Sequence, residues 1–214
     1  MMQEDFGLIS IIMAAYNTEK TIEQAINSVS SQTYTNFELL VVNDCSKDRT
    51  VELVKDIVAK DSRVRLISNV KNSGVSYTRK HGLEEAKGDW IAILDSDDAW
   101  EPEKLEKQIV LQRRTNADLL FTGSAFMDSE GHPIDWCLHA PKEVTYRQLL
   151  KQNVLSNSSA LVRKELYAKY YAIGDGMHED FAIWLSILKE GKKAYGVDAV
   201  SYTHLRAHET RSNL

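Results

Sequence analysis

The sequence predicts an α/β fold with a mostly parallel central sheet and helices on both of its faces. Two observations lead to this prediction. Short apolar runs alternate along the chain with longer segments whose apolar residues recur at helical spacing. The runs are apolar at consecutive positions, which is typical of strands buried on both faces in parallel sheets. Because crossovers between such strands are right-handed, successive helices can cover both faces of one sheet.

The first two strand–helix units occupy the N-terminal part of the chain. Residues 8–15 are a β-rich apolar run and predict the first central strand. Residues 19–31 follow with apolar side chains at helical spacing, and Thr18 is a suitable N-cap for that helix. The pattern repeats with a strand over residues 37–42 and a helix over residues 50–60.

Two further strands follow before the chain changes character. Residues 64–67 predict a short third strand and residues 75–86 a third helix, which Gly88 would close as a C-cap. Residues 90–94 are the fourth apolar run. Parallel strands end at the same rim of a sheet, so the polar segments that follow them should meet there.

An acidic cluster follows the fourth strand directly. Asp95, Asp97 and Asp98 fall within four positions, and like charges this close raise one another's pKa and repel. Such a cluster persists most easily around a divalent cation or a set of hydrogen-bond donors. As an alternative, Asp97 or Asp98 could cap the helix that Pro102 helps to start. The position at the carboxyl end of a strand favours a ligand site.

The regular alternation of apolar runs and helical segments ends beyond this cluster. We expect a helix over residues 103–114, a strand over 118–123, and an irregular stretch over 124–143 with a hairpin turn at 128–131. The remaining expected elements are a short helix at 146–151, a strand at 158–162, a helix at 179–189 and a strand at 194–200. Residues 1–200 are therefore interpreted as one domain, with halves at 8–123 and 124–200, and residues 201–214 as a tail of uncertain origin.

Composition limits the classes of protein to consider. The 26 Lys and Arg residues against 31 Asp and Glu residues give a net charge of −5, so nucleic acid is not expected as a partner. Cys45 and Cys137 form no CxxC pair, which favours free thiols in a reducing cytosol. The first five residues are acidic where a signal peptide would be basic, and the run at residues 8–15 is too short to span a bilayer. We expect a cytoplasmic protein.

Five segments in a fixed order resemble the family 2 glycosyltransferases, a group of inverting enzymes with a GT-A fold. They are residues 10–17, 42–50, 72–82, 95–98 and 179–184. Together they extend the resemblance from about residue 8 to about residue 200. It implies transfer of a hexosyl or N-acetylhexosaminyl group from a UDP-sugar to a hydroxyl of a glycan or lipid-linked acceptor, as in cell-surface polysaccharide synthesis.

The resemblance also implies a cofactor and a location. Such enzymes use Mn²⁺ or Mg²⁺, and many continue into a C-terminal region that associates with the membrane. Residues 201–214 do not match that continuation. The chain is therefore expected in the cytoplasm, with attachment to the inner face of the membrane depending on a region that this sequence does not show; the oligomeric state is not implied.

The resemblance assigns roles to individual positions. Asp180 matches the catalytic base. The positions that match the nucleotide-sugar site are Ala15, Tyr16, Asn17, Glu19, Asp44, Gly74, Arg79, Asp95 and Ser96. The metal ligands of the DXD motif correspond to Asp97 and Asp95, and contacts to the acceptor are expected from Glu179, Trp184, Ser156 and Asn157.

The chemistry gives these residue types a reason, although simpler roles stay open. A leaving diphosphate gathers charge that a cation held by carboxylates can neutralise, and inversion needs a base to remove the acceptor proton. At a helix start, the dipole favours ionised Asp180, while burial by Trp184 would raise its pKa again. Asp44 could instead be a turn residue, and Gly74 could serve turn geometry alone.

Two other functions remain to be weighed. A nucleotidyltransferase that builds sugar nucleotides would also use carboxylates and a metal, but residues 14–18 lack the glycines and basic side chains of a phosphate loop. A non-catalytic nucleotide-sugar-binding subunit is the other alternative. The complete set of Asp95, Asp97 and Asp180 argues against that subunit, and the unusual tail argues weakly for it.

Overall fold

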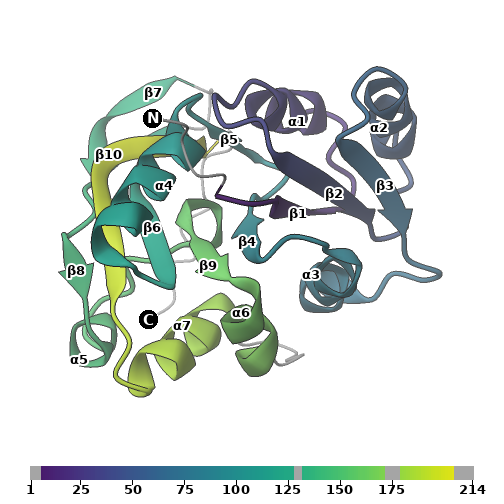
Figure 1. The fold of residues 1–214 in the computed structure, drawn as a ribbon. Coiled ribbons are helices and arrows are strands. Elements are labelled where there is room, and N and C mark those ends of the chain that lie inside the picture. Colours follow the sequence, from purple (N-terminus) through teal and green to yellow (C-terminus); the bar gives the residue numbers. More distant parts are fainter. Residues whose placement is uncertain (1–5, 128–131, 172–178, 205–214) are drawn as a thin grey trace.

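The computed structural model describes residues 6–127, 132–171 and 179–204, and these form one sheet flanked by helices (Figure 1). The strands are β1 (Ile9–Ala15), β2 (Phe37–Asn43), β3 (Val64–Ser68), β4 (Trp90–Ile93), β5 (Asp98–Trp100), β6 (Leu119–Met127), β7 (Pro133–Leu138), β8 (Glu143–Val144), β9 (Leu161–Arg163) and β10 (Ala194–His204). The helices are α1 (Ile22–Ser30), α2 (Thr50–Val58), α3 (Gly74–Glu85), α4 (Lys104–Thr115), α5 (Tyr146–Leu149), α6 (Lys164–Tyr170) and α7 (Glu179–Lys189), with a 3₁₀ turn η1 (Asn157–Ser159). Within these ranges, no helix combines the length and the apolar character needed to cross a bilayer.

The strand order confirms the predicted α/β fold. Along the sheet the order is β3, β2, β1, β4, β9, β6, β10 and β5, with β7 beside β6 and β8 beside β10. The N-terminal part, from β3 to β4, is entirely parallel. Beyond β4 the sheet is mixed, because β9 runs antiparallel to both of its neighbours while β6 and β10 are parallel to each other.

Two apolar layers hold the helices against the sheet. Consecutive side chains of a strand point to opposite faces, so a run that is apolar at every position supplies both layers. On β1, Ile11 belongs to the layer that includes α1, α2 and α4, whereas Ile12 belongs to the layer of α3, α6 and α7. The helices of these two layers lie on opposite sides of the strands in Figure 1. Helices on both faces are therefore confirmed.

Three local predictions around helix ends are wrong. α1 begins at Ile22, three residues later than a cap at Thr18 would allow. Gly88 is not a C-cap, because α3 has already ended; a Cβ at this position would lie 2.4 Å from the Leu8 carbonyl oxygen, so Gly88 permits close approach to the start of β1. Asp98 does not cap α4 but begins the short strand β5.

The C-terminal half is more regular than the sequence predicts. The stretch expected to be irregular holds the extension of β6 and the antiparallel strand β7, while the turn expected at residues 128–131 lies outside the described residues. Ser158 and Ser159 lie in η1, so the strand there starts only at Leu161. α6 was not predicted. β10 does not stop at residue 200 but pairs with β5 as far as His204.

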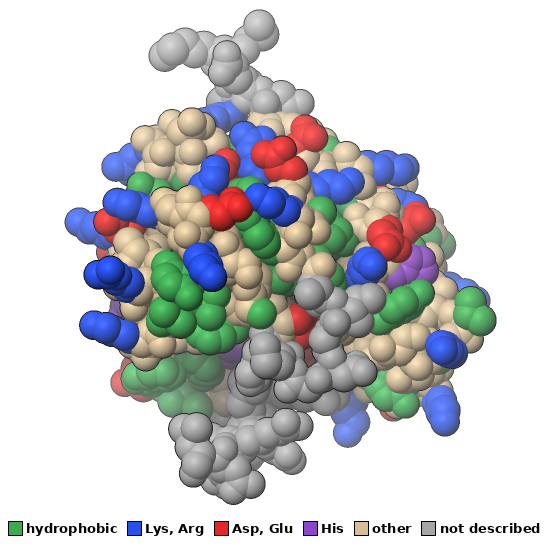
Figure 2. All heavy atoms as spheres, turned by 90° about the horizontal axis from the view of Figure 1, so that it is seen from below, with side chains coloured by type: hydrophobic (Ala, Val, Ile, Leu, Met, Phe, Trp, Pro, Cys, Tyr) green, Lys and Arg blue, Asp and Glu red, His purple; other side chains and the backbone are tan. Residues whose placement is uncertain are grey.

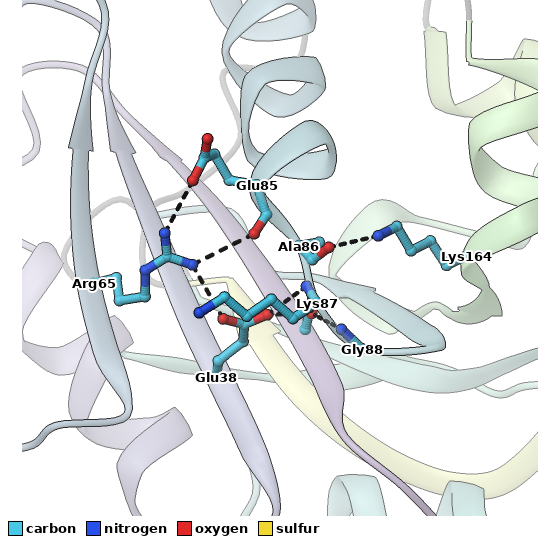
Figure 3. Close-up of polar contacts among 8 residues, drawn as sticks. Glu38, Arg65, Glu85, Ala86, Lys87, Gly88 and Lys164 are labelled. Carbon is cyan, nitrogen blue, oxygen red and sulfur yellow. Dashed lines mark hydrogen bonds and ion pairs between the residues drawn. The ribbon is translucent and has the colours of Figure 1, made fainter.

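A buried polar cluster joins the elements at the amino ends of the central strands (Figure 3). The Ser10 hydroxyl and the Lys87 N–H each donate a hydrogen bond of 2.7 Å to Oε1 of Glu38. The Gly88 N–H donates to the Ser10 oxygen at 2.8 Å, and Arg65 donates to the second Glu38 oxygen at 3.2 Å. The cluster therefore fixes β1, β2, β3 and the connection from α3 to β4 at this end of the sheet.

Ser10→Ala is expected to lower the free energy of unfolding by about 1–3 kcal/mol, because it leaves the Gly88 N–H and one Glu38 oxygen short of a buried partner. Urea unfolding followed by circular dichroism measures the change. The matched control is Ser31→Ala, whose exposed hydroxyl donates to the Ser28 carbonyl, with an expected change within about 0.5 kcal/mol. Equal unfolding midpoints for the two variants would contradict the structural role of Ser10.

Candidate functional site

A pocket of about 320 Å³ opens at the carboxyl ends of β1, β2 and β4. This is the rim at which open α/β sheets bind ligands. The lining residues come from the ends of these strands and from the start of α3: Ala14, Ala15, Tyr16, Thr18, Asp44, Asn72, Gly74, Val75, Thr78, Arg79, Asp95, Ser96 and Asp97. The structure thus brings together seven of the residues that the sequence assigned to a nucleotide sugar, namely Ala15, Tyr16, Asp44, Gly74, Arg79, Asp95 and Ser96.

Asp44 builds the wall of the pocket as well as lining it. Its carboxylate is 4% exposed and accepts hydrogen bonds from Asn69 Nδ2 at 2.8 Å, from the Ser73 N–H at 2.9 Å and from the Gly74 N–H at 2.8 Å. Two of these donors are backbone N–H groups at the start of α3, which no helical carbonyl can satisfy. Gly74 has a φ of +82°, a conformation that favours glycine. The turn geometry considered for Gly74 is therefore present, whereas the Asp44 carboxylate binds the start of α3 rather than its own turn.

Asn17 and Glu19 tie two rim loops together rather than lining the pocket. The side-chain oxygen of Asn17 accepts from the Lys47 N–H at 2.8 Å, and the Glu19 carboxylate accepts from the Arg49 N–H at 3.1 Å. In return, Asp48 accepts from the Glu19 N–H. Slight burial opposes the charge of Asp48, but its hydrogen bonds lower its pKa below the ordinary value. These contacts hold the loops after β1 and β2 side by side.

The sequence did not predict Thr18, Asn72, Val75 and Thr78 as part of the pocket. Thr78 and Arg79 follow Val75 by three and four positions, which places them on the same face of α3 as Val75. That spacing was a usable signal, because the same face carries the Arg79 that the resemblance had already assigned.

The acidic cluster divides into two parts. Asp95 and Asp97 line the pocket, whereas Asp98 is 2% exposed and lies below it. Asp98 accepts from the Ser158 hydroxyl at 2.5 Å and pairs with His204 at 2.8 Å, a residue of the tail that does not match the family. Burial raises the pKa of Asp98, although the hydrogen bond with His204 opposes this shift. Asp98 is therefore a structural residue.

Asp95 and Asp97 offer two carboxylates to a cation. Among residues 6–127, 132–171 and 179–204, no three His, Cys, Asp or Glu side chains group closely enough to hold a metal ion by themselves. Mg²⁺ is commonly held by one or two carboxylates and completes its shell with water and substrate phosphates. The pair in the pocket fits a cation of this kind, and Mn²⁺ accepts the same oxygen ligands.

Arg79 connects this pair to the start of α7. One end of its guanidinium donates to Asp95 at 2.5 Å and the other to Glu179, and only 9% of its side chain is exposed. Burial disfavours the charge, but the carboxylates of Asp95 and Glu179 outweigh it and raise the pKa of Arg79 above its ordinary value. Nε of Arg79 is buried and has no partner among the described residues.

Asp180 follows at the second position of α7. Burial raises its pKa, while a 2.7 Å hydrogen bond from the Phe181 N–H and the charge of Arg79 act in the opposite direction. A carboxylate with a raised pKa is a better proton acceptor than an ordinary one and is typical of general bases. The structure therefore brings a potential base within electrostatic reach of the pocket.

The residues predicted on the acceptor side are not exposed together. Trp184 has no exposed surface and packs against Tyr167 with ring centroids 5.7 Å apart, so it belongs to the core and the prediction of an acceptor contact is wrong. The Ser156 hydroxyl bonds to that of Tyr202 at 2.5 Å. Asn157 is 5% exposed, and its side-chain oxygen lacks a partner within the described part of the chain.

Comparison with known proteins points to one family. Residues 10–171 match the family described as Glycosyl transferase family 2. The chain is 37% identical over 186 residues to the UDP-Glc:alpha-D-GlcNAc-diphosphoundecaprenol beta-1,3-glucosyltransferase WfgD of Escherichia coli, covering 87% of this chain and 72% of that protein. It is 35% identical over 202 residues to WfaP of Escherichia coli, which carries the same description, covering 94% and 78%.

A solved structure supports the same grouping. The crystal structure of S. aureus TarS 1–349 in complex with UDP matches with a TM-score of 0.76 and 25% identity, over 91% of this chain and 59% of that chain. The chain thus spans less than two thirds of the length of TarS 1–349. The likeness confirms the GT-A fold that the resemblance implied.

Asp44→Asn is expected to lower the free energy of unfolding by about 1–3 kcal/mol, because an amide turns an NH₂ group toward at least one of three donors. Hydrogen exchange should accelerate at residues 69–78. Urea unfolding and exchange measured by mass spectrometry test both effects. Asp56→Asn makes the same change at an exposed position of α2 and is the control; unchanged exchange at residues 69–78 in Asp44→Asn would refute the anchoring role.

Proposed function

Because the chain belongs to glycosyl transferase family 2, we propose that it transfers a sugar from a UDP-sugar to a hydroxyl of a lipid-linked or polysaccharide acceptor, with inversion. One observation carries the proposal: the rim pocket holds Asp44, Arg79, Asp95 and Asp97, and Asp180, with its raised pKa, interacts electrostatically with Arg79 and Asp95. The descriptions of WfgD and WfaP name UDP-Glc as donor and a diphosphoundecaprenol-linked acceptor, and the TarS structure contains UDP.

The donor would lie along the rim. In this proposal the uridine lies between Tyr16 and Asp44, the ribose lies near Asp95, and the diphosphate extends toward Asp97. Tyr16 is 46% exposed and so can pack its ring against a base, while Asn17 and Glu19 act indirectly by holding the loop that carries it. We also propose that residues 8–123 form the nucleotide-sugar half and residues 124–200 the acceptor half.

Asp95 and Asp97 would hold Mn²⁺ or Mg²⁺. Bound there, the cation would neutralise the charge that gathers on the departing diphosphate. Asp95 has a second task, since one of its oxygens pairs with Arg79, and this pair competes with a ligand for that oxygen. Asp97 is thus the carboxylate whose removal should affect the cation most directly.

Asp180 would act as general base. Its carboxylate removes the proton of the acceptor hydroxyl while that oxygen attacks the anomeric carbon from the face opposite UDP, and the bond to UDP breaks with its electrons on the diphosphate. The step needs no covalent intermediate. A diphosphoundecaprenol-linked acceptor would lie at a membrane, so the enzyme would work at the inner face of that membrane.

The match to family 2 favours this proposal over the nucleotidyltransferase considered above. The alternative of a non-catalytic nucleotide-sugar-binding subunit differs from this proposal in that such a subunit would not turn over its ligand. The environment of Asp180 favours turnover, because a partly buried carboxylate with a raised pKa is typical of general bases.

A panel of UDP-sugars that includes UDP-glucose tests the function through metal-dependent release of UDP. Wild type is expected to release UDP with Mn²⁺ or Mg²⁺ and to stop when EDTA removes the metal. Asp97→Asn should lose on the order of 10²-fold or more in rate, because a catalytic cation contributes several kcal/mol to transition-state stabilisation. Asp56→Asn is the exposed control. Undetectable binding of UDP in the presence of Mn²⁺ would overturn the donor assignment.

Asp180→Asn is expected to lower kcat by about 10²–10⁴-fold with UDP binding retained, because general base catalysis contributes that much. The base must be ionised, so activity is present above its pKa in the folded protein and falls as the pH drops through it. Burial raises this pKa above the ordinary 3.8, so the acid limb of the kcat/KM profile should lie above that value. Turnover by Asp180→Asn equal to wild type would exclude Asp180 as base, and an acid limb at or below 3.8 would contradict the raised pKa.

A further inference from the structure

We propose that Glu179 is a positioning residue: through its ion pair with Arg79 it fixes the start of α7, and with it Asp180, relative to the carboxylates after β4. This inference rests on the proposed function and deepens it. It replaces the expectation that Glu179 contacts the acceptor.

The described part of α7 begins at Glu179 and Asp180, and a contact from outside the helix is needed to anchor these two residues relative to the pocket. The hydrogen bond to the Asp180 carboxylate comes from Phe181, a residue of the same helix, and therefore does not place Asp180 relative to the pocket. Apolar contacts of Phe181, Ile183 and Trp184 hold one face of α7 against the core, and Glu179 adds a contact toward the pocket.

Arg79 provides that anchor. It lies on α3, whose first N–H groups are held by Asp44, and it pairs with Asp95 at the end of β4 as well as with Glu179. The Glu179 side chain is 11% exposed, so the pair is shielded from water. Charge-assisted hydrogen bonds from a guanidinium are among the strongest and most directional in proteins. Two ion pairs of Arg79 thus connect Asp95 in the donor pocket to Glu179, the residue next to the base.

A second contact supports the same junction. The Tyr171 hydroxyl, just after α6, donates to the Ser76 carbonyl of α3 at 2.7 Å. The ring of Tyr167 lies between those of Tyr171 and Trp184, with centroids 5.3 Å and 5.7 Å away. α3 is therefore held to α6 by Tyr171 and to α7 by Glu179, and only the second contact reaches the first turn of α7.

Figure 2 views the molecule from the side of α6 and α7, where Lys and Arg side chains lie among acidic ones. One exposed pair of this region joins Lys169 to Glu190 at 2.7 Å, just beyond the other end of α7. Glu190 supplies a matched control, because Glu190→Gln removes the same charge from an ion pair that water already screens.

Glu179→Gln is expected to lower kcat by about 10–10²-fold, because small displacements of a catalytic group have effects of this size. The decisive comparison is between transfer to the acceptor and hydrolysis of the UDP-sugar by water. Both reactions need Asp180 to remove a proton, so both rates should fall together, with KM for donor and acceptor within about twofold of wild type. Glu190→Gln should match wild type, and Glu179→Asp should recover part of the lost rate.

Hydrogen exchange at residues 179–185 tests the same idea without catalysis. Exchange there should be faster in Glu179→Gln than in Glu190→Gln, and the increase should be larger at residues 179–185 than at residues 50–58 of α2. Unchanged exchange in this segment would overturn the proposal. So would unchanged hydrolysis combined with a raised acceptor KM, which indicates direct contact with the acceptor. If wild type turns over no UDP-sugar, the proposed function fails, and the exchange experiment still decides the role of Glu179.

Discussion

The parallel pairing of β1 with β2 and β4 is the constraint on which the site depends. Parallel strands end at one rim, so segments separated by dozens of residues meet there without any direct attraction between them. Asp44 and Asp95 lie in one pocket for this reason. The same pairing buries both faces of the strands, and that burial supplies the apolar contacts that hold α3 in place.

The sequence was sufficient for most of the N-terminal half, because its strands are mainly apolar and α1 and α2 carry apolar residues at regular helical spacing. It failed where structure depends on partners far along the chain. β7 forms only because β6 extends beside it, and η1 interrupts an expected strand where the Ser158 hydroxyl bonds to Asp98. Such long-range contacts override local preference, and no local pattern reports them.

The site, like the fold, could be predicted from the sequence only in part. The polar residues after each strand could be placed on the rim from topology alone, but their individual tasks could not. The carboxylate oxygens of Asp44 and Glu19 accept hydrogen bonds from backbone N–H groups of neighbouring loops. Trp184 is a core residue. The separation of Asp98 from Asp95 and Asp97 depends on β5, a three-residue strand that gave no signal in the sequence.

The contact between Gly82 and β1 has a consequence for the whole pocket. A Cβ at position 82 would lie 2.7 Å from a methyl group of Ile12, so the backbone of α3 rests directly on the Ile12 side chain of β1. Arg79 lies three positions earlier on the same face of α3. The height of Arg79 above the sheet is therefore set by the absence of a side chain at position 82. Any larger residue there would act as a spacer, lifting the guanidinium away from Asp95 while leaving every residue of the pocket chemically intact.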